Sequence, residues 1–556
     1  PETEPAEIIK EYEAAYSTEV KKPYDIVYEQ NALIIFKSMS QGNIHRYILK
    51  LNDESAIEGW QRLNLGASEN MTITVNEAKT IKKNGNKINA ERYGAEVVFT
   101  NLEPGDYIYV AYTEKQVNGG KSSLFISDTY TFDSYFPVYK LEYHLVVEDG
   151  VKFQTTFLNG SIDVQVKTLE GFKQHSWTAI RPPVLEEEAY AIPLSDVAKS
   201  LHISLDYTWK DIAQWYSDLS GHQAKADYTI KQLVKEMFGE KDYSNYEKAR
   251  MIYDFVCKNI QYSWIDFRQS GYIPQKASDV YHSRLGDCKD VSTLYASLAR
   301  EAGLDAQLVL INTRNNGQKN VYLPSLNFNH CIVKVNIEQK PTYLELTDPD
   351  LPFGHLYYYH QGAAILEIPN KPPSENIQLN YLALNEGFPN VVERKSKITV
   401  DEDLQMRIEV NSVKTGTNAS SMCKSYYNQD HKQQKEDIQR SISNSFNSIV
   451  KLESLNFEQL APLKDSAVYS YDFVVTDEIM KVGSFKSIKI PFSDLIATKD
   501  IFEGNDRNFE FDYIYYENTD QYSEEILVSI APEFVIAEIP ENVHLEYNGN
   551  IYDLKL

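Results

Sequence analysis

The hydrophobic pattern changes its period twice along the chain, and this limits the possible folds more than any other feature. In the first and last parts of the sequence, apolar and polar residues alternate over short runs, which is typical of half-buried β-strands. Between them, apolar residues recur at intervals of three and four, as on one face of a helix. We therefore predict a multidomain α+β protein. It has a tail or helix at 1–23, a β-sandwich at 24–222, an α+β core at 223–375 and a β-rich domain at 376–556.

Turn signals separate the alternating runs of the predicted sandwich. The runs at 32–36, 71–75 and 107–112 are examples, and the dipeptides Asn84-Gly85 and Pro104-Gly105 mark turns. In the last region the pattern predicts strands interrupted by one amphipathic helix. Its apolar face holds Ile438, Ile442, Phe446 and Ile449. A chain of 556 residues is also too long for one hydrophobic core, which agrees with several domains.

The net charge of −25 narrows the classes of partner. An acidic surface repels phosphate groups, so nucleic acid and anionic lipid are disfavoured. No apolar stretch approaches the ~18 residues that a membrane-spanning helix needs. The chain begins at Pro1 with a polar, acidic segment, which fits an exported protein after removal of its signal peptide, or a shortened sequence. The oligomeric state is not indicated by any pattern.

The cysteines and the paired histidines do not predict a metal site. None of the four cysteines forms a C-x-x-C pair, so a zinc or redox motif is unsupported. We interpret Cys257, Cys331 and Cys423 as buried apolar residues. His355 and His360 have no carboxylate or cysteine at a known ligand spacing, so we interpret them as part of a tyrosine-rich surface loop.

The start of a predicted helix carries the candidate nucleophile. In the segment Gly286-Asp287-Cys288-Lys289-Asp290, Asp287 is a good N-cap and Cys288 falls in the first turn. Unpaired backbone amides and the helix dipole there favour a thiolate, and the same amides can stabilise an oxyanion. Lys289 adds positive charge nearby. We therefore predict that Cys288 is a nucleophile.

A base and an orienting acid follow in the sequence. His330 stands at the head of a predicted strand, where it can accept the proton of a thiol. A third group should fix the tautomer of the imidazole. The next strand supplies two candidates, Glu345 and Asp348, and the pattern alone leaves both open.

These segments together resemble the transglutaminase-like (papain-like thiol) superfamily of bacteria. The similar segments are Gly271-Tyr-Ile-Pro274, Asp279 to Leu304 around Cys288, Phe328-Asn-His330, and Tyr343 to Pro349. The family order of Cys, His and acid is kept. The register on Thr347 places Glu345 where the family usually has Asp, and this favours Glu345 over Asp348. The family also uses an upstream side chain to assist the oxyanion; Trp264 is the candidate, with core packing as the alternative.

The flanking regions also resemble domains that accompany this core. Residues 24–220 are similar to a β-sandwich domain of unknown function that precedes it in exported bacterial proteins, and the C-terminal part is similar to a β domain that follows it. The resemblance implies a periplasmic or cell-surface location.

The resemblance implies a cysteine-type peptidase, amidohydrolase or acyltransferase that acts on peptide or carboxamide bonds. Cys288, His330 and Glu345 or Asp348 would form the triad, and Asp287 would support the helix start. A peptide or protein substrate is implied, with no metal and no organic cofactor. The alternative is a weakly active or inactive module of the same fold that binds peptide or glycan at the cell envelope.

Overall fold

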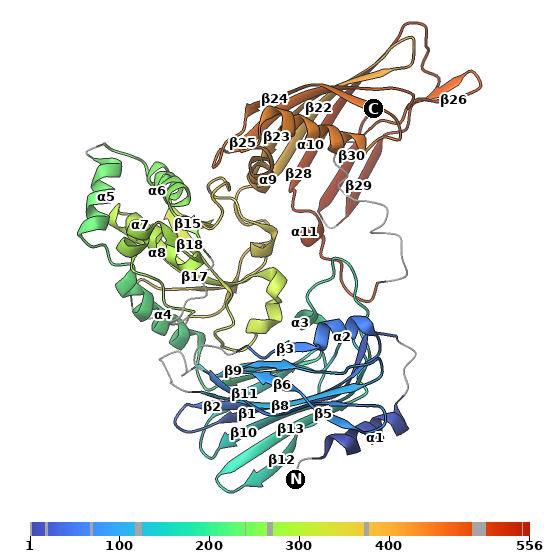
Figure 1. Ribbon diagram of the computed structural model, residues 1–556. Helices are drawn as coiled ribbons and strands as arrows, with labels where there is room; N and C mark the ends of the chain where they lie inside the picture. Colours follow the sequence, from blue (N-terminus) through green and yellow to red (C-terminus); the bar gives the residue numbers. More distant parts are fainter. Residues whose placement is uncertain are drawn as a thin grey trace. The chain divides into compact units, whose positions relative to one another are not determined.

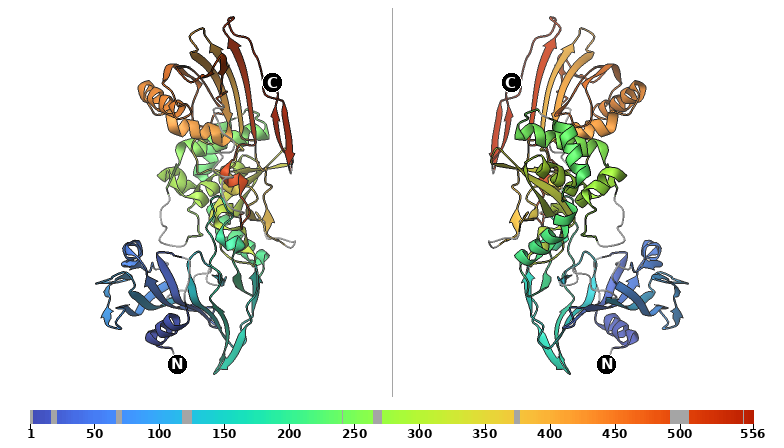
Figure 2. Two further views of the ribbon diagram at one scale, coloured as in Figure 1. Left: turned by 90° about the vertical axis from the view of Figure 1, so that its right-hand side faces the viewer. Right: turned by 90° about the vertical axis from the view of Figure 1, so that its left-hand side faces the viewer.

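The computed structural model describes residues 3–16, 21–66, 71–116, 125–239, 241–263, 271–371, 377–491, 507–547 and 549–556 (Figures 1 and 2). The chain divides into two compact units. The first unit contains Pro1–Pro349, Leu356–Gly387 and Lys499–Asn518, and the second contains Asp350–His355, Phe388–Thr498 and Thr519–Leu556. None of the helices in the described ranges combines the length and the apolar character needed to span a bilayer.

The first unit begins with a large, mainly antiparallel sheet. Its strands, in spatial order, are β12 (Gln165–Leu169), β13 (Phe172–Ile180), β10 (Val138–Glu148), β1 (Tyr24–Ile35), β2 (Gln41–Leu51), β8 (Tyr107–Gln116), β4 (Met71–Ile81) and β5 (Lys87–Asn89). Only β1 and β10 pair in parallel within this sheet. Alternation of large apolar side chains along β10 puts Leu141, Tyr143, Leu145 and Val147 on one face, as the period of two predicts.

Both faces of this sheet are covered. One face packs on two small sheets, β11 (Phe153–Leu158), β14 (Ser200–Leu205) and β9 (Ser127–Thr131), and β3 (Arg62–Asn64), β7 (Glu96–Val98) and β6 (Glu91–Tyr93), and on α2 (Glu54–Trp60). The other face receives α1 (Pro5–Ala15), which buries Ile8, Ile9 and Tyr12. The expected packing of sheet on sheet is therefore present, with an additional helix layer.

The second part of the first unit is an α+β domain. Its sheet has the order β19 (Lys340–Leu344), β18 (His330–Ile337), β17 (Asp305–Asn312), β20 (Ala364–Glu367) and β21 (Asn380–Tyr381). The helices are α4 (Trp209–Gln223), α5 (Tyr228–Phe238), α6 (Asn245–Asn259), α7 (Ala277–Ser283) and α8 (Cys288–Glu301). The predicted capping box of α6 is formed by Ser244 and Glu247. α8 is buried along most of its length and lies against β17 and β18.

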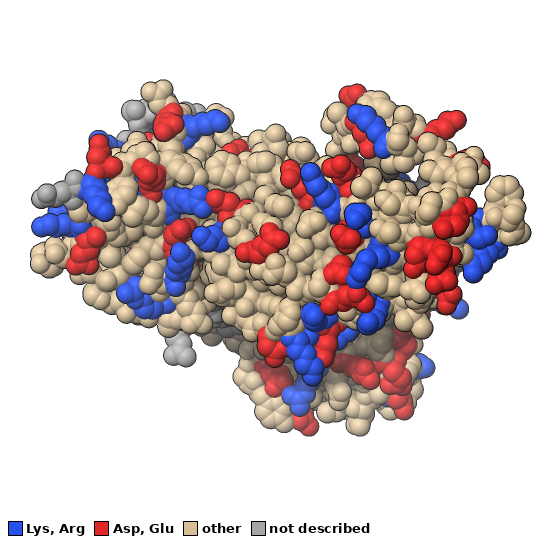
Figure 3. Space-filling view, turned by 90° about the horizontal axis from the view of Figure 1, so that it is seen from above, with Lys and Arg blue, Asp and Glu red and all other residues tan. Residues whose placement is uncertain are grey.

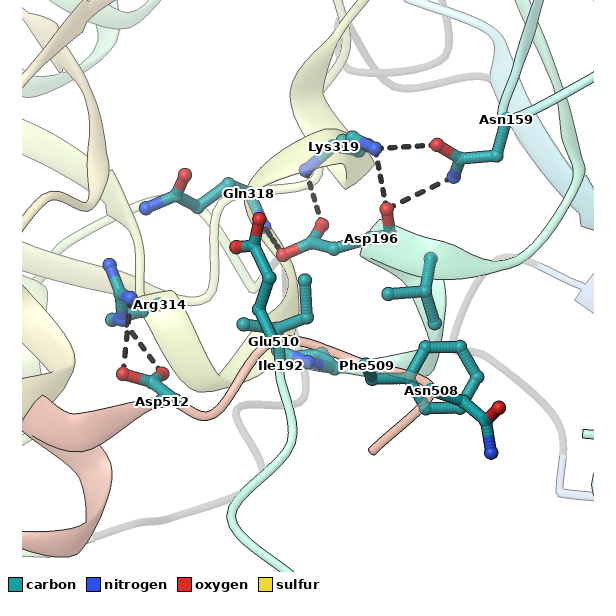
Figure 4. Close-up of a pocket in the computed structure, with 12 residues that line it drawn as sticks. Asn159, Ile192, Asp196, Arg314, Gln318, Lys319, Asn508, Phe509, Glu510 and Asp512 are labelled. Carbon is teal, nitrogen blue, oxygen red and sulfur yellow. Dashed lines mark hydrogen bonds and ion pairs between the residues drawn. The ribbon is translucent and has the colours of Figure 1, made fainter. Parts of the chain in front are cut away.

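Short segments join the sandwich to this domain around a cavity of about 490 Å³ (Figure 4). The carboxylate of Asp196, in α3 (Leu194–Val197), accepts from the amides of Gln318 and Lys319 at the start of the 3-10 helix η3 (Gln318–Val321). Arg314, in η2 (Arg314–Asn316), forms a two-pronged ion pair with Asp512, just before α11 (Tyr513–Tyr516). The Asp196 carboxylate is thus held by backbone amides, and Arg314 and Asp512 form an ion pair with each other.

The second unit is built on a five-stranded sheet of order β24 (Val450–Gln459), β25 (Ser466–Val475), β23 (Met406–Thr415), β22 (Val391–Val400) and β28 (Gln521–Ile530). Two helices, α9 (Gly416–Tyr426) and α10 (His431–Ser443), lie on the same side of it (Figure 2). Two hairpins, β26 (Met480–Val482) with β27 (Phe485–Ser487) and β29 (Val543–Tyr547) with β30 (Asn550–Leu554), complete the described elements.

The prediction of a single helix in this region was wrong. α10 ends at Ser443, so Phe446 and Ile449 lie beyond it, and Ile449 is 77% exposed. α9 was not predicted, although the apolar residues that it buries, Ala419, Met422 and Cys423, recur at helical spacing. On the face of the molecule drawn in Figure 3, acidic and basic side chains are interspersed.

The sandwich core gives a first test of the fold. We expect Leu145→Ala to lower the free energy of unfolding by about 2–5 kcal/mol, because it leaves a cavity at a fully buried position between two sheets. Urea unfolding followed by tryptophan fluorescence measures this, since Trp177 lies in the same cluster. Val166→Ala on β12, where the side chain is 56% exposed, should change stability by no more than about 0.5 kcal/mol. Equal effects of the two substitutions would contradict the packing.

Candidate active site

The start of α8 is fixed by a close backbone approach and a capping box. A side chain at Gly286 would place its Cβ 2.8 Å from Asp290 Cβ and 3.3 Å from Val280 Cγ1, so only glycine fits there. Asp287 caps the helix, and the carboxylate of Asp290 accepts in return from the amide of Asp287 at 3.1 Å. The fully buried Asp290 also accepts from the backbone and side chain of Gln275. Cys288 is therefore the first helical residue, and it is partly exposed.

The amides of this first turn do not all remain free, contrary to the expectation from sequence. One oxygen of Asp287 accepts from the amides of Lys289 and Asp290, at 3.1 and 3.2 Å. The other oxygen pairs with the buried ammonium of Lys289. Within the described ranges no acceptor contacts the amide of Cys288 itself. An oxyanion at the thiol would therefore meet one free amide.

His330 lies between the thiol and a carboxylate. It is the first residue of β18, and its side chain is 14% exposed. Nε2 of its ring lies 2.7 Å from Oε2 of Glu345. The Cys288 thiol lies close enough to the ring to contribute to a raised pKa of His330. Since Nε2 is occupied by Glu345, Nδ1 is the nitrogen left for the thiol.

Glu345 follows the end of β19 and is 1% exposed. Its Oε1 accepts from the amide and the hydroxyl of Thr347, at 2.7 and 2.6 Å, while Oε2 faces His330. The other candidate acid, Asp348, accepts from the hydroxyl of Tyr357. The geometry thus brings Glu345 to the imidazole and directs Asp348 to a tyrosine.

His330 and Glu345 each stabilise the charged form of the other. Burial lowers the pKa of His330, but the Glu345 carboxylate and the hydrogen bond with Cys288 outweigh it and hold this pKa well above its usual value. Burial raises the pKa of Glu345, but His330 and a second imidazole, His360, outweigh it and hold this pKa well below its usual value. The pair is therefore an imidazolium and a carboxylate around neutral pH.

His360 was missed by the sequence interpretation. It was assigned to a surface loop, but it lies in the 3-10 helix η4 (Tyr358–His360) with no exposed surface, and its Nε2 is 3.0 Å from Glu345 Oε2. His355 is also buried, but it belongs to the second unit. The ligand atoms of His330, Glu345 and His360 lie within 4.8 Å of one another, a spacing that suits either a metal or shared protons.

Three further kinds of residue were considered for the site: the oxyanion candidate, a nearby tyrosine and the other cysteines. Trp264 lies outside the described residues. Tyr262, in β15 (Gln261–Tyr262), is 37% exposed; burial, then the neighbouring Cys288, raises its pKa to about 12. The other cysteines are buried, and burial raises the pKa of the thiols of Cys257 and Cys331 well above the usual value, so they are poor nucleophiles.

Comparison with known proteins agrees with this geometry. Residues 231–344 match the model of the transglutaminase-like superfamily. The chain is similar to a crystal structure from Parabacteroides distasonis ATCC 8503, described as a candidate protease, with 13% identity and a TM-score of 0.56 over 82% of this chain and 94% of that chain. At this identity the similarity shows the fold. The predicted multidomain α+β architecture with a transglutaminase-like core is thus confirmed.

A second structure was also found. It comes from Cytophaga hutchinsonii, is described as a candidate cysteine protease, and aligns over 40% of this chain and 79% of that chain. The identity is 13% and the TM-score is 0.19, which is too low to support an argument. Comparison with curated proteins gave no match.

The approach at Gly286 can be tested by adding one methyl group. We expect Gly286→Ala to destabilise the protein by about 1–3 kcal/mol, because the new Cβ pushes on Asp290 and Val280. Thermal unfolding measures the change. Gly221→Ala in α4 is the matched control: its Cβ would meet no atom within 4 Å, so it should stabilise by about 0.5–1 kcal/mol. Similar melting temperatures for the two variants would show that the approach is not tight.

The ion pair predicts a defined pH dependence of stability. Glu345 has a lowered pKa, so its stabilisation is complete above the unfolded value of about 4.3 and is lost as the pH falls further. His330 has a raised pKa, so its stabilisation is complete below about pH 6.5 and is lost as the pH rises through the folded value.

The stability difference between wild type and Glu345→Gln should therefore be largest between about pH 4.5 and 6.5. Urea unfolding at a series of pH values measures it. A difference that is independent of pH would show that the two groups are not an ion pair.

Proposed function

We propose that this chain, whose residues 231–344 match the transglutaminase-like superfamily, is a thiol enzyme of acyl transfer or hydrolysis on peptide or carboxamide bonds. The observation that carries the proposal is the position of the His330 ring, which lies 2.7 Å from the buried Glu345 carboxylate and near enough to the Cys288 thiol for the two to influence each other electrostatically. A nucleophile, a base and an orienting acid in contact are the minimum for covalent catalysis.

Each group has a defined task in the first step. The Cys288 sulfur attacks the carbonyl carbon, and its proton is held by His330. The developing oxyanion accepts a hydrogen bond from the free amide of Cys288. Collapse breaks the carbon–nitrogen bond, and His330 gives its proton to the leaving amine, which leaves a thioester on Cys288.

The second step decides the reaction class. His330 takes a proton from water or from an incoming amine, which attacks the thioester and expels the Cys288 sulfur. Water gives a carboxylic acid, as in a peptidase or amidase, and an amine gives a new amide. Glu345 holds Nε2 of His330 in both steps and keeps Nδ1 directed at the sulfur.

Iodoacetamide labelling tests the site without a known substrate. At pH 6 an ordinary thiol, with a pKa of about 8.5, is only a few thousandths ionised. We expect Cys288 to be labelled at least about 10-fold faster than glutathione at this pH, and His330→Ala to remove most of that advantage. Peptide mapping by mass spectrometry identifies the labelled residue.

His282→Ala is the matched control, because His282 is an exposed histidine on the neighbouring helix α7. It should keep the wild-type labelling rate. If the Cys288 thiol of the wild type reacts no faster than glutathione, the proposed enzyme activity is contradicted and a binding module is favoured. Hydroxylamine added to a peptide mixture then tests for the thioester itself, since both hydrolysis and transfer pass through it and its attack by hydroxylamine gives a hydroxamate.

We extend the proposal to the location of the enzyme. An exported protein would meet peptide and protein substrates in the periplasm or at the cell surface. Fractionation of the source cells followed by immunoblotting tests this, and a signal confined to the cytoplasmic fraction contradicts it.

A further inference from the structure

A second imidazole contacts the same carboxylate oxygen as His330. Nε2 of His360 lies 3.0 Å from Oε2 of Glu345, and the two imidazole rings are 5.7 Å apart between centroids. Neither His360 nor Glu345 is more than 1% exposed. Nε2 of His360 does not meet Glu345 Oε2 in hydrogen-bond geometry, so the contact is a close electrostatic one. How these three groups interact therefore depends on which ring nitrogens of the two imidazoles carry protons.

The backbone determines the proton on His360. The amide of Tyr357 donates to Nδ1 of His360 at 3.2 Å. A nitrogen that accepts a hydrogen bond carries no proton, so the proton of the neutral ring is on Nε2. This Nε2–H is the group that faces Glu345.

The same tautomer argues against a metal at this position. A histidine that binds a metal through Nε2 must carry its proton on Nδ1, where it usually donates to an oxygen. Here Nδ1 faces the N–H of Tyr357, so that proton would meet another donor. Shared protons therefore explain the cluster of His330, Glu345 and His360 better than an ion does.

We propose that His360 is a positioning residue of the Cys288–His330–Glu345 site, whose uncharged imidazole presents its Nε2–H 3.0 Å from Glu345 Oε2 and holds that oxygen against His330 by electrostatic attraction. This inference rests on the proposed function and adds a residue to it. Thr347 fixes Oε1 through two donors, but Oε2 would otherwise be held only by the ring that it must orient. His360 supplies the independent donor.

The electrostatics agree with an uncharged His360. Burial lowers its pKa, the Glu345 carboxylate raises it in part, and the result is below the usual value. His330 has the opposite shift, so the positive charge stays on the ring that contacts the thiol. Other titratable groups around the cluster include Tyr253 and Cys257 on α6, Tyr262 on β15, Tyr359 on η4 and Asp348, which is held by Tyr357.

The proton assignment is tested first on the wild-type protein. Long-range ¹H–¹⁵N correlation spectra at pH 7, assigned by comparison with His360→Gln, report the tautomer of each histidine. We expect His360 to be neutral with its proton on Nε2. A proton on Nδ1, or an imidazolium at this pH, would overturn the proposal without any need for a stable variant.

The role in the site is tested by the pH profile of Cys288 alkylation. His360→Phe keeps an aromatic ring but removes the donor. In the plot of the Cys288 alkylation rate against pH, we expect the step at which His330 loses its proton to move down by about one pH unit. His360→Gln retains a donor and should recover at least about half of that shift. His355→Phe is the control, since His355 is a buried histidine of the second unit, and it should leave the profile unchanged.

Three results would speak against this role. A folded His360→Phe protein with the wild-type profile would show that His360 does not position Glu345. Zinc binding near one equivalent that is lost in His360→Phe would assign the cluster to a metal. If the wild-type thiol is not activated at all, the proposed function fails, and the tautomer spectrum still decides the proton assignment of His360.

Discussion

The buried carboxylate of Glu345 is the interaction on which the rest of the site depends. A charged group removed from water costs several kcal/mol unless donors replace its hydration. Here Thr347 provides two donors and His330 a third, and Nε2 of His360 makes a close contact at 3.0 Å. These groups come from the end of β19, from β18 and from η4, so the carboxylate ties three segments of the first unit together. The loop after β19 must fold around Glu345 for the site to exist.

The thiol side of the site is built independently of the acid side. Its position follows from the tight approach at Gly286 and from the reciprocal capping of Asp287 and Asp290, which are local to the start of α8. α8 is then held on the sheet, where the hydroxyl of Ser292 donates to the carbonyl of Cys331 at 3.2 Å. Since Cys331 follows His330, this hydrogen bond holds the start of β18, which carries the imidazole, against α8, which carries the thiol. The thiol and the carboxylate are therefore held by separate sets of contacts, and the His330 imidazole lies between the segments that carry them.

The parts that sequence predicted are those with local signals. The N-cap at Asp287 and the alternating runs at 32–36, 71–75 and 107–112 depend on neighbours in the chain, and the structure reproduces them at the start of α8 and in β1, β4 and β8. His360 carried no such signal, because its environment is made by Glu345, a residue distant in the chain, and by one backbone amide. The choice between Glu345 and Asp348 was left open by pattern alone for the same reason: both follow one strand, and only the loop path decides which reaches the ring.

The two imidazoles on Glu345 have different roles because their second ring nitrogens face different partners. Nδ1 of His360 faces the amide of Tyr357, a donor that cannot accept a proton. Nε2 of His330 is taken by Glu345, so Nδ1 is left for the nearby Cys288 thiol, which can both give and take a proton. Only His330 can therefore exchange a proton during a reaction, although both rings share one carboxylate oxygen. Since two adjacent cations in a buried cluster would repel each other strongly, an uncharged His360 is also the condition under which His330 can hold its charge.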